Sequence, residues 1–360
     1  MIYTNLRKFI YKLDPEVAHS VGEKFMRFMN FSPVCRGIWR KMNRVSDQRL
    51  NQNIFGEKFE NPVGLGAGFD KNASMINEIN SLGFGFTEIG TITPKPQDGN
   101  PKPRLYRHVK EETIQNAMGF NNQGLDEVVK RVKKLYPFSY PVGINIGKNK
   151  ETSEDKAIED YITLIDAFEK YTSYLVINIS SPNTPNLRDL QNEKFIKELF
   201  TKAQERTQKP ILLKIAPDMS EKSAVELSRF AVESGASGII ATNTTVDYSL
   251  ISDPQKFGGG LSGKVLKEQS FKIFEAIAKE LYGKAVLISV GGIDSPEEAY
   301  RRLKAGASLV QVYSALVFQG PALTKNINKG LLKFMKRDGY SNISDAIGSW
   351  EGKKDIVKKI

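Results

Sequence analysis

A polar loop after residue 177 carries side chains whose types could do chemistry: Asn178, Ser181, Asn183 and Thr184. The run before it, residues 174–179, is apolar and short, as expected of a buried strand. Two prolines stiffen the loop, and Pro182 biases Ser181 away from helical geometry. Amide and hydroxyl groups at a strand end can bind a planar polar ligand, and a hydroxyl can move a proton. The alternative is an Asn/Pro turn that only connects a strand to a helix.

The elements that would position this loop alternate regularly along the chain. Short apolar runs occur at residues 62–66, 85–89, 141–146, 174–179, 211–215, 238–241, 285–290 and 309–312. Amphipathic helical patterns between them cover residues 155–171, 192–207, 220–234, 269–281 and 295–305, with Asn192, Ser220 and Ser295 placed as N-caps. Eight such units predict an α/β fold, a closed (β/α)₈ TIM barrel. An open Rossmann-like sheet is the alternative, but no G-x-G-x-x-G stands between a strand and a helix.

One interruption separates the second and third predicted strands. Residues 91–119 contain several prolines near their start and alternating segments at 104–109 and 112–117. We expect a small β insertion at the catalytic mouth of the barrel, followed by a helix over residues 123–135. A barrel needs about 250 residues, so the insertion, an N-terminal segment and a C-terminal tail account for the rest of the chain.

Asparagines gather at the predicted strand ends, where ligands bind in such barrels. They include Asn116 at the end of the insertion and Asn145, Asn178 and Asn243 after three different strands. Each amide offers donors and an acceptor, which suits the alternating N–H and C=O edge of a pyrimidine or another amide-rich ring. A single asparagine would more readily be a turn residue, but this recurrence favours a ligand site. Lys71, after the glycines at 64–68, adds a positive charge.

The last third of the chain is rich in glycine at 258–263 and at 291–292, and its eighth strand leads into Tyr313 and Ser314. Glycine turns after strands seven and eight of a barrel usually bind phosphate, so we expect a phosphate-bearing cofactor. Lys214, at the end of strand five, could stabilise a reduced, anionic flavin. The alternative is a lysine paired with a carboxylate inside the barrel, which we favour less because few acidic residues lie near these strand ends.

Composition limits the remaining function classes. The chain has 360 residues, one cysteine and two histidines. A single Cys35 excludes an intramolecular disulfide, a cysteine-ligated zinc and an iron–sulfur cluster, and fits a reducing compartment. His19 and His108 are far apart in sequence, so we expect no metal site.

The formal charge of +11 is concentrated near the N-terminus. Residues 1–45 carry nine Lys/Arg against three Asp/Glu, mixed with large apolar side chains. This pattern predicts an amphipathic helical segment on an anionic membrane surface; a helix packed on its own domain is the alternative, and no nucleic-acid-binding motif is present. No apolar run approaches the ~20 residues needed to span a bilayer. We expect two parts: the segment 1–45, and a catalytic barrel over 46–360.

These motifs together resemble those of the dihydroorotate dehydrogenases, in their membrane-associated, quinone-using class. The resemblance runs from about residue 14 to residue 348. It rests on DPEVAH (14–19), GAGFDKN (66–72), GTITPKPQ (90–97), RLYR (104–107), NAMGFNN (116–122), NISSPNTP (178–185), KIAPD (214–218), ATNTT (241–245), GGLSG (259–263) and VGGID (290–294).

The resemblance implies a cofactor, a substrate and a base, all at the barrel mouth. FMN would be contacted by Ala67, Gly68, Thr91, Asn145, Asn178, Lys214, Thr242, Gly263, Gly292, Tyr313 and Ser314. Dihydroorotate would stack on it, bound by Lys71, Asn116, Met118, Gly119, Phe120, Asn178, Asn183, Asn243 and Thr244. Ser181 would remove the C5 proton while C6 gives a hydride to the flavin, and we add a proton relay through water or Thr184.

The resemblance also implies the electron acceptor. Soluble relatives carry a cysteine at the position of Ser181, so a serine together with the N-terminal segment indicates a membrane quinone. In the quinone class this segment forms two helices around an apolar tunnel, whose inner end matches His19, Arg107 and Tyr313. The expected product is orotate for pyrimidine biosynthesis, and the expected location is peripheral, on the cytoplasmic face of the cell membrane. No obligate protein partner is expected, and the type of quinone stays open.

Three alternatives remain at this point. One is a soluble flavin enzyme acting on dihydroorotate or a dihydropyrimidine with another electron acceptor. Another is a flavin-free, phosphate-binding barrel enzyme such as an aldolase or epimerase, which the loop around Ser181 and the asparagines argue against. The last is a non-catalytic membrane-bound barrel, which the presence of Lys71, Ser181 and Lys214 argues against.

Overall fold

Eight parallel strands close into a barrel in the computed structural model, which describes residues 2–349. Around the barrel their order is β10, β12, β13, β3, β4, β7, β8, β9. Their bounds are β3 (Val63–Leu65), β4 (Phe86–Ile92), β7 (Val142–Ile146), β8 (Tyr174–Asn178), β9 (Ile211–Ile215), β10 (Gly238–Ala241), β12 (Val286–Val290) and β13 (Leu309–Val312). All eight coincide with the predicted apolar runs, so the (β/α)₈ fold is confirmed. The runs are largely apolar because these strands are buried on both faces.

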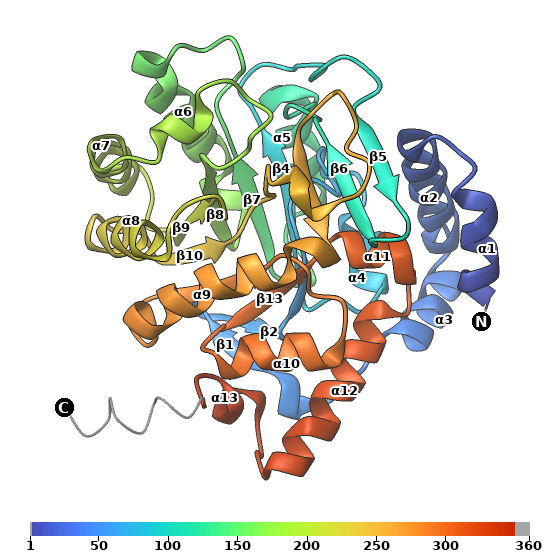
Figure 1. The fold of residues 1–360 in the computed structure, drawn as a ribbon. Helices are drawn as coiled ribbons and strands as arrows, with labels where there is room; N and C mark the ends of the chain where they lie inside the picture. The colour runs from blue at the N-terminus through green and yellow to red at the C-terminus, as the bar shows by residue number, and fades with distance from the viewer. Residues whose placement is uncertain (1, 350–360) are drawn as a thin grey trace.

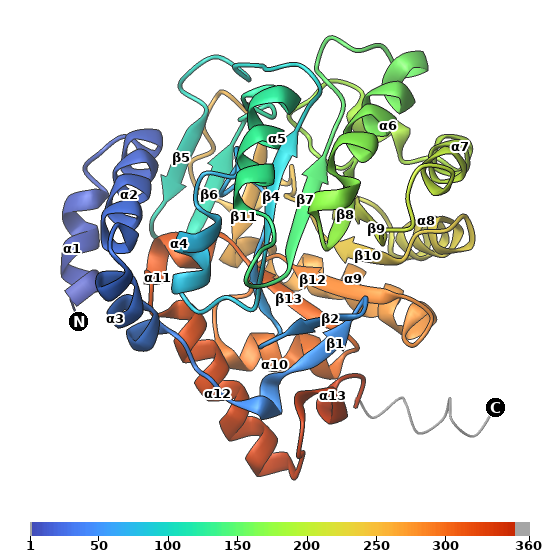
Figure 2. The same cartoon turned by 180° about the vertical axis from the view of Figure 1, so that it is seen from behind.

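Helices surround this barrel (Figures 1 and 2). They are α4 (Ile76–Ser81), α5 (Gly124–Leu135), α6 (Ala157–Phe168), α7 (Glu193–Gln204), α8 (Glu221–Glu233), α9 (Lys267–Leu281), α10 (Pro296–Lys304), α11 (Ser314–Gln319), α12 (Leu323–Asp338) and α13 (Ile343–Ala346). The three predicted N-caps are confirmed: the side chains of Asn192, Ser220 and Ser295 accept hydrogen bonds from the backbone N–H groups of Phe195, Ser223 and Glu298.

The predicted β insertion forms an antiparallel sheet at the mouth, with one strand more than expected. Strands β5 (Leu105–His108) and β6 (Thr113–Asn116) pair as the alternation indicated, and Figure 1 shows them between the barrel and α2. The third strand, β11 (Gly260–Gly263), pairs with β6 from far along the chain. Gly259 permits this approach, because a Cβ there would lie 2.0 Å from the carbonyl oxygen of Asn116.

A short hairpin that the sequence analysis did not predict packs below the barrel. It consists of β1 (Gln52–Ile54) and β2 (Glu57–Phe59), joined by Phe55 and Gly56, both at positive φ. Positive φ at both central residues is the geometry of a type I′ hairpin turn. The Phe59 and Phe86 ring centroids lie 5.6 Å apart, so the hairpin contributes to the apolar filling of the barrel interior.

Three helices form the N-terminal segment: α1 (Ile2–Ile10), α2 (Pro15–Asn30) and α3 (Pro33–Asn43). The resemblance implied two helices here, and the structure has three. The breaks follow from local sequence, because Asp14 and Ser32 each cap a new helix that starts with a proline. The segment lies against β5, α4 and α11 (Figures 1 and 2).

The segment presents a row of exposed apolar side chains, namely Leu6, Phe9, Leu13, Val17, Val21, Phe25, Phe28, Phe31, Val34, Ile38 and Met42. The other side of α1 is anchored, since the Tyr3 hydroxyl donates to the carbonyl of Val317 at 2.7 Å. Within residues 2–349, no helix is long and apolar enough to cross a membrane.

Candidate active site

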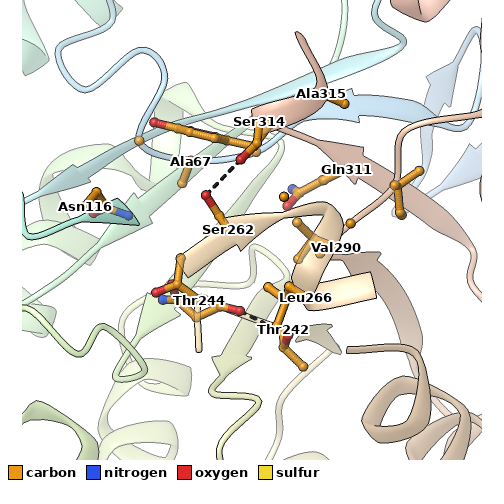
Figure 3. A pocket seen from close by; sticks show the side chains of 18 of the residues that line it. Ala67, Asn116, Thr242, Thr244, Ser262, Leu266, Val290, Gln311, Ser314 and Ala315 are labelled. Atoms are coloured by element: carbon orange, nitrogen blue, oxygen red, sulfur yellow. Dashed lines mark hydrogen bonds between the residues drawn. The ribbon is translucent and has the colours of Figure 1, made fainter. Parts of the chain in front are cut away.

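A cavity opens at the carboxyl ends of the barrel strands, beside the mouth sheet, and encloses about 1210 Å³ including its open mouth. Figure 3 shows side chains from several elements converging on it. Its wall contains most of the predicted site residues: Ala67, Gly68, Lys71, Thr91, Asn116, Met118, Gly119, Phe120, Asn178, Ser181, Asn183, Lys214, Thr242, Asn243, Thr244, Gly263, Gly292, Tyr313 and Ser314. Asn145 lies behind this wall, and His19 and Arg107 lie outside it.

The asparagine amides are held by one another. Asn145 accepts a hydrogen bond from the Thr91 hydroxyl at 2.6 Å and another from the Asn178 amide at 3.1 Å. Asn178 also donates to Thr91, and Asn243 donates to the Ser180 hydroxyl at 3.0 Å. Because each amide is fixed by its neighbours, the wall presents a rigid pattern of donors and acceptors.

Lys214 does have a carboxylate partner inside the barrel. Its Nζ lies 3.6 Å from Oε1 of Glu88, which is buried on β4. Asn145 and Gln311 donate amide hydrogen bonds to the two oxygens of Glu88 at 2.7 and 2.6 Å. The alternative that was less favoured, a lysine paired with a carboxylate inside the barrel, is therefore present, because Glu88 lies within β4 rather than at a strand end. Lys214 nevertheless lines the cavity, so the pair places a fixed cation in its wall.

The Ser181 loop is held by a network that sequence reasoning did not identify. Arg188 donates to the carbonyls of Ser180 and Thr244, at 3.0 and 2.8 Å, and forms an ion pair with Asp218 at 2.7 Å. Ser181 is 6% exposed, and its Oγ accepts from the backbone N–H of Asn183 at 3.2 Å. This bond leaves the hydroxyl proton free to point into the cavity.

The wall leaves polar atoms without partners. Oδ1 of Asn183, Oγ1 of Thr244 and Oε1 of Gln311 are buried and make no hydrogen bond within the described part of the chain. Thr184 Oγ1, proposed above as a relay, is likewise buried and unbonded, and no hydrogen bond joins it to Ser181 among residues 2–349. Buried polar atoms are normally satisfied, so orphans in a cavity wall indicate a polar ligand.

Lys71 provides a second cation. Its Nζ donates to the carbonyl of Gly68 at 2.6 Å, and no ion pair is formed with it in the described range 2–349. Burial lowers the pKa of Lys71 to about 8, because it disfavours the ammonium form. The side chain is still mainly charged at neutral pH, and an anionic ligand would offset its desolvation.

Glycine-bearing loops after β11 and β12 form another part of the wall. Gly263, Gly291 and Gly292 all have positive φ, which favours glycine. Within the described residues, the backbone N–H groups of Gly291 and Gly292 donate to no acceptor. Ser262 shares a hydrogen bond of 2.8 Å with Ser314 across the cavity edge (Figure 3). Ser262 was not predicted, although it stands inside the quoted GGLSG motif.

Of the three residues predicted for a quinone, His19 and Tyr313 are linked through one aromatic ring, and Arg107 makes separate contacts to the N-terminal segment. The His19 ring lies edge-on to Phe69 at 4.9 Å, and Phe69 lies 6.0 Å from the Tyr313 ring. Burial, with help from the charge on Lys71, lowers the pKa of His19 to about 4, so the imidazole is neutral. Arg107 donates to the carbonyls of Tyr11 and Leu13 and thereby fixes the α1–α2 turn to β5.

These features define the chain as a (β/α)₈-barrel enzyme whose mouth is lined by buried amides, two lysines and glycine loops. Within residues 2–349, no group of histidine, cysteine, aspartate or glutamate side chains could hold a metal ion.

Comparison with known proteins narrows the class. Residues 49–335 match the family described as Dihydroorotate dehydrogenase. The chain is 60% identical to the dihydroorotate dehydrogenase (quinone) of Sulfurimonas denitrificans, over 96% of this chain and 98% of that protein. The corresponding enzyme of Sulfurovum sp. is 58% identical over the same shares. A crystal structure of the Eimeria tenella enzyme with ferulenol has a TM-score of 0.84 at 37% identity, covering 93% of this chain and 95% of that one. The chain therefore belongs to the dihydroorotate dehydrogenase family, in its quinone-dependent class.

Proposed function

We propose that this chain oxidises (S)-dihydroorotate to orotate in pyrimidine biosynthesis, with FMN as its cofactor and a membrane quinone as the final electron acceptor. The observation that carries the proposal is the cavity wall of fixed asparagine amides beside Lys71 and Ser181. A dihydropyrimidine ring needs amide partners for its N–H and C=O groups, a cation for its carboxylate and a base at C5. Family membership supports the same reaction.

The residues of the wall fit FMN. Lys214 offers a cation at the strand ends, and Thr91, Asn178 and Thr242 offer hydrogen-bonding groups for a flavin ring. The unbonded N–H groups of Gly291 and Gly292 suit a phosphate. Gln311 contributes an orphaned acceptor in the same wall. Further contacts are assigned to Ala67, Gly68, Asn145, Gly263, Tyr313 and Ser314. When bound, FMN supplies a two-electron acceptor for the hydride from C6 and passes the electrons on to quinone.

The protein's own groups carry the proton chemistry and bind the substrate. Lys71 holds the carboxylate, and Asn116, Asn178, Asn183, Asn243 and Thr244 hold the ring amides, with Met118, Gly119 and Phe120 packing around it. Ser181 takes the C5 proton as its own hydroxyl proton passes to a water molecule. Its burial and its bond from the Asn183 N–H orient the hydroxyl toward the cavity and exclude bulk water.

The quinone side is assigned to the N-terminal segment, residues 1–45, attached to a catalytic barrel of residues 46–360. His19 lies on α2 of this segment, Arg107 bonds to its α1–α2 turn, and Tyr313 lines the cavity. A neutral His19 imidazole can donate or accept one hydrogen bond with a quinone carbonyl. The exposed apolar row on α1–α3, with basic side chains around it, supports peripheral attachment to the cytoplasmic face of the membrane.

A single spectroscopic experiment tests the reaction. The purified chain is expected to show a flavin spectrum that bleaches when dihydroorotate is added without oxygen. A flavin that stays oxidised would keep the cofactor but require another substrate. A protein that remains colourless after FMN is supplied would overturn the proposal. Reoxidation by quinone-containing vesicles, measured afterwards, separates the quinone reaction from a soluble acceptor.

A further inference from the structure

Arg302 is a fully buried arginine that the proposed reaction does not use. It lies on α10 with no exposed surface, outside the cavity wall. Its Nε donates to Oε1 of Glu298 at 2.6 Å, one helical turn earlier. A buried ion pair is not in itself a strong source of stability, so the remaining contacts of the guanidinium are the informative ones.

Those contacts join two segments that border the cavity, which we call the cradle loops: residues 264–267, a 3-10 turn after β11 with the first residue of α9, and residues 291–295 between β12 and α10. Nη2 of Arg302 donates to the carbonyl of Lys267 at 2.8 Å and to the carbonyl of Gly291 at 3.1 Å. The Ser270 hydroxyl lies 3.0 and 2.8 Å from the same two carbonyls, between which it shares its one proton, and it also accepts from Arg302. One charged group therefore binds both loops at once.

The cradle loops approach each other so closely that only glycine fits at two positions. A Cβ on Gly292 would lie 2.5 Å from Cα of Lys267, and one on Gly291 would lie 2.8 Å from Cβ of Ser270. The carbonyl of Gly291 points toward Arg302. The backbone N–H groups of Gly291 and Gly292 make no hydrogen bond with the described residues, and both glycines line the cavity. An array of free backbone N–H groups after strand seven is suited to a phosphate.

We propose that Arg302, held by Glu298, is a positioning residue that fixes the cradle loops for the phosphate of the cofactor. The inference rests on the proposed FMN function and adds a residue that touches neither cofactor nor substrate. By donating to the Gly291 carbonyl, Arg302 orients the Gly291–Gly292 peptide unit so that the Gly292 N–H on its opposite edge faces the cavity. Its effect is confined to the phosphate end, because the amides that would contact the ring belong to other strands.

The test compares FMN with riboflavin, which lacks the phosphate. The apoprotein is titrated with each flavin, and binding is followed by quenching of flavin fluorescence. Arg302→Gln is expected to weaken FMN binding about tenfold or more, the scale of one charge-assisted hydrogen bond, and to leave riboflavin binding nearly unchanged. Equal weakening of both flavins, or of neither, overturns the positioning role. A wild-type apoprotein that binds no FMN overturns the proposed function together with this inference.

Two milder variants and a control keep the result interpretable. Ser270→Ala preserves the ion pair and removes one link between the loops, so a smaller loss restricted to FMN is expected. Glu298→Gln combined with Arg302→Gln avoids leaving an unpaired buried carboxylate and decides the question if the single variant does not fold. Arg301→Gln is the neighbouring control: it loses the same charge from α10, and Arg301 pairs with Glu268 and with the second carboxylate oxygen of Glu298, but it contacts neither loop carbonyl. If the control variant also weakened binding of FMN but not of riboflavin, the proposal would be contradicted.

Discussion

The ammonium group of Lys214 lies 3.6 Å from the carboxylate of Glu88, and both groups are buried inside the barrel. Glu88 is also the acceptor for Asn145 and Gln311, so one carboxylate connects a cation and two amides beneath the cavity. Removing it affects all three neighbours at once, because buried networks are cooperative.

We expect Glu88→Gln to lower the free energy of unfolding by about 3 kcal/mol, since it leaves Lys214 as an unpaired buried charge. A glutamine at position 88 would also place an NH₂ group against the amide donors of Asn145 and Gln311, which need an acceptor there. Urea denaturation of the purified variant measures the change. Glu198→Gln removes a carboxylate from the exposed pair with Lys202 and serves as a control without measurable effect. Equal stability of the two variants would contradict the network.

Ser181→Ala is expected to retain bound flavin and to slow its reduction by dihydroorotate by about a hundredfold or more, the usual contribution of a positioned base. Anaerobic stopped-flow absorbance measures this half-reaction without interference from quinone. Ser180→Ala, at the preceding residue, is a useful comparison because the Ser180 hydroxyl contacts Asn178 and Asn243 and is not the proposed base. Near-normal reduction in the Ser181 variant would remove it from the base role.

Lys71 predicts a pH dependence. Its pKa is lowered to about 8, so the ammonium form, which we propose binds the substrate carboxylate, is lost as the pH rises through 8. We therefore expect kcat/KM for dihydroorotate, which reports the free enzyme, to fall about tenfold per pH unit above pH 8. Lys71→Gln should reduce kcat/KM roughly a hundredfold at pH 7 and abolish that decline. A variant with the same pH profile as the wild type would exclude Lys71 as the titrating group.

Deletion of residues 1–45 tests the N-terminal segment. The cavity wall belongs entirely to residues 66–319, so flavin binding and reduction by dihydroorotate are expected to persist. Reoxidation by quinone should fall strongly, because His19 and the backbone partners of Arg107 are lost. Full quinone activity in the truncated protein would show that the segment does not form the acceptor site. Melting temperature, measured in parallel, controls for loss of the α1–α11 contacts.

Much of this architecture could be predicted from the sequence because its signals are local. Each barrel strand is a largely apolar run, and Asn192, Ser220 and Ser295 mark helix starts by short-range hydrogen bonds. Strand β11 gave no such signal: it consists of Gly, Leu, Ser and Gly, and its partner lies about 144 residues away. Its assignment depends on a tertiary contact.

The cavity residues were predictable by type, but their partners were not. A strand buried on both faces has no alternation, so the sequence does not indicate that Glu88 points into the barrel toward Lys214. Arg188 and Arg302 act through carbonyls on distant loops, which no spacing rule reveals. Polar groups that hold site residues in place without lining the cavity can be identified only from the three-dimensional structure.

The attachment of α1 has a consequence for how the molecule is made. Tyr3 bonds to the carbonyl of Val317, 314 residues further along the chain. A ribosome adding about 5–20 residues per second takes roughly 15 to 60 s to cover that distance. During this time α1 has already been synthesised, but α11, against which it packs, has not. The apolar side chains of α1 are then available to chaperones or to a lipid surface, so the proposed attachment to the membrane can begin before the barrel is complete.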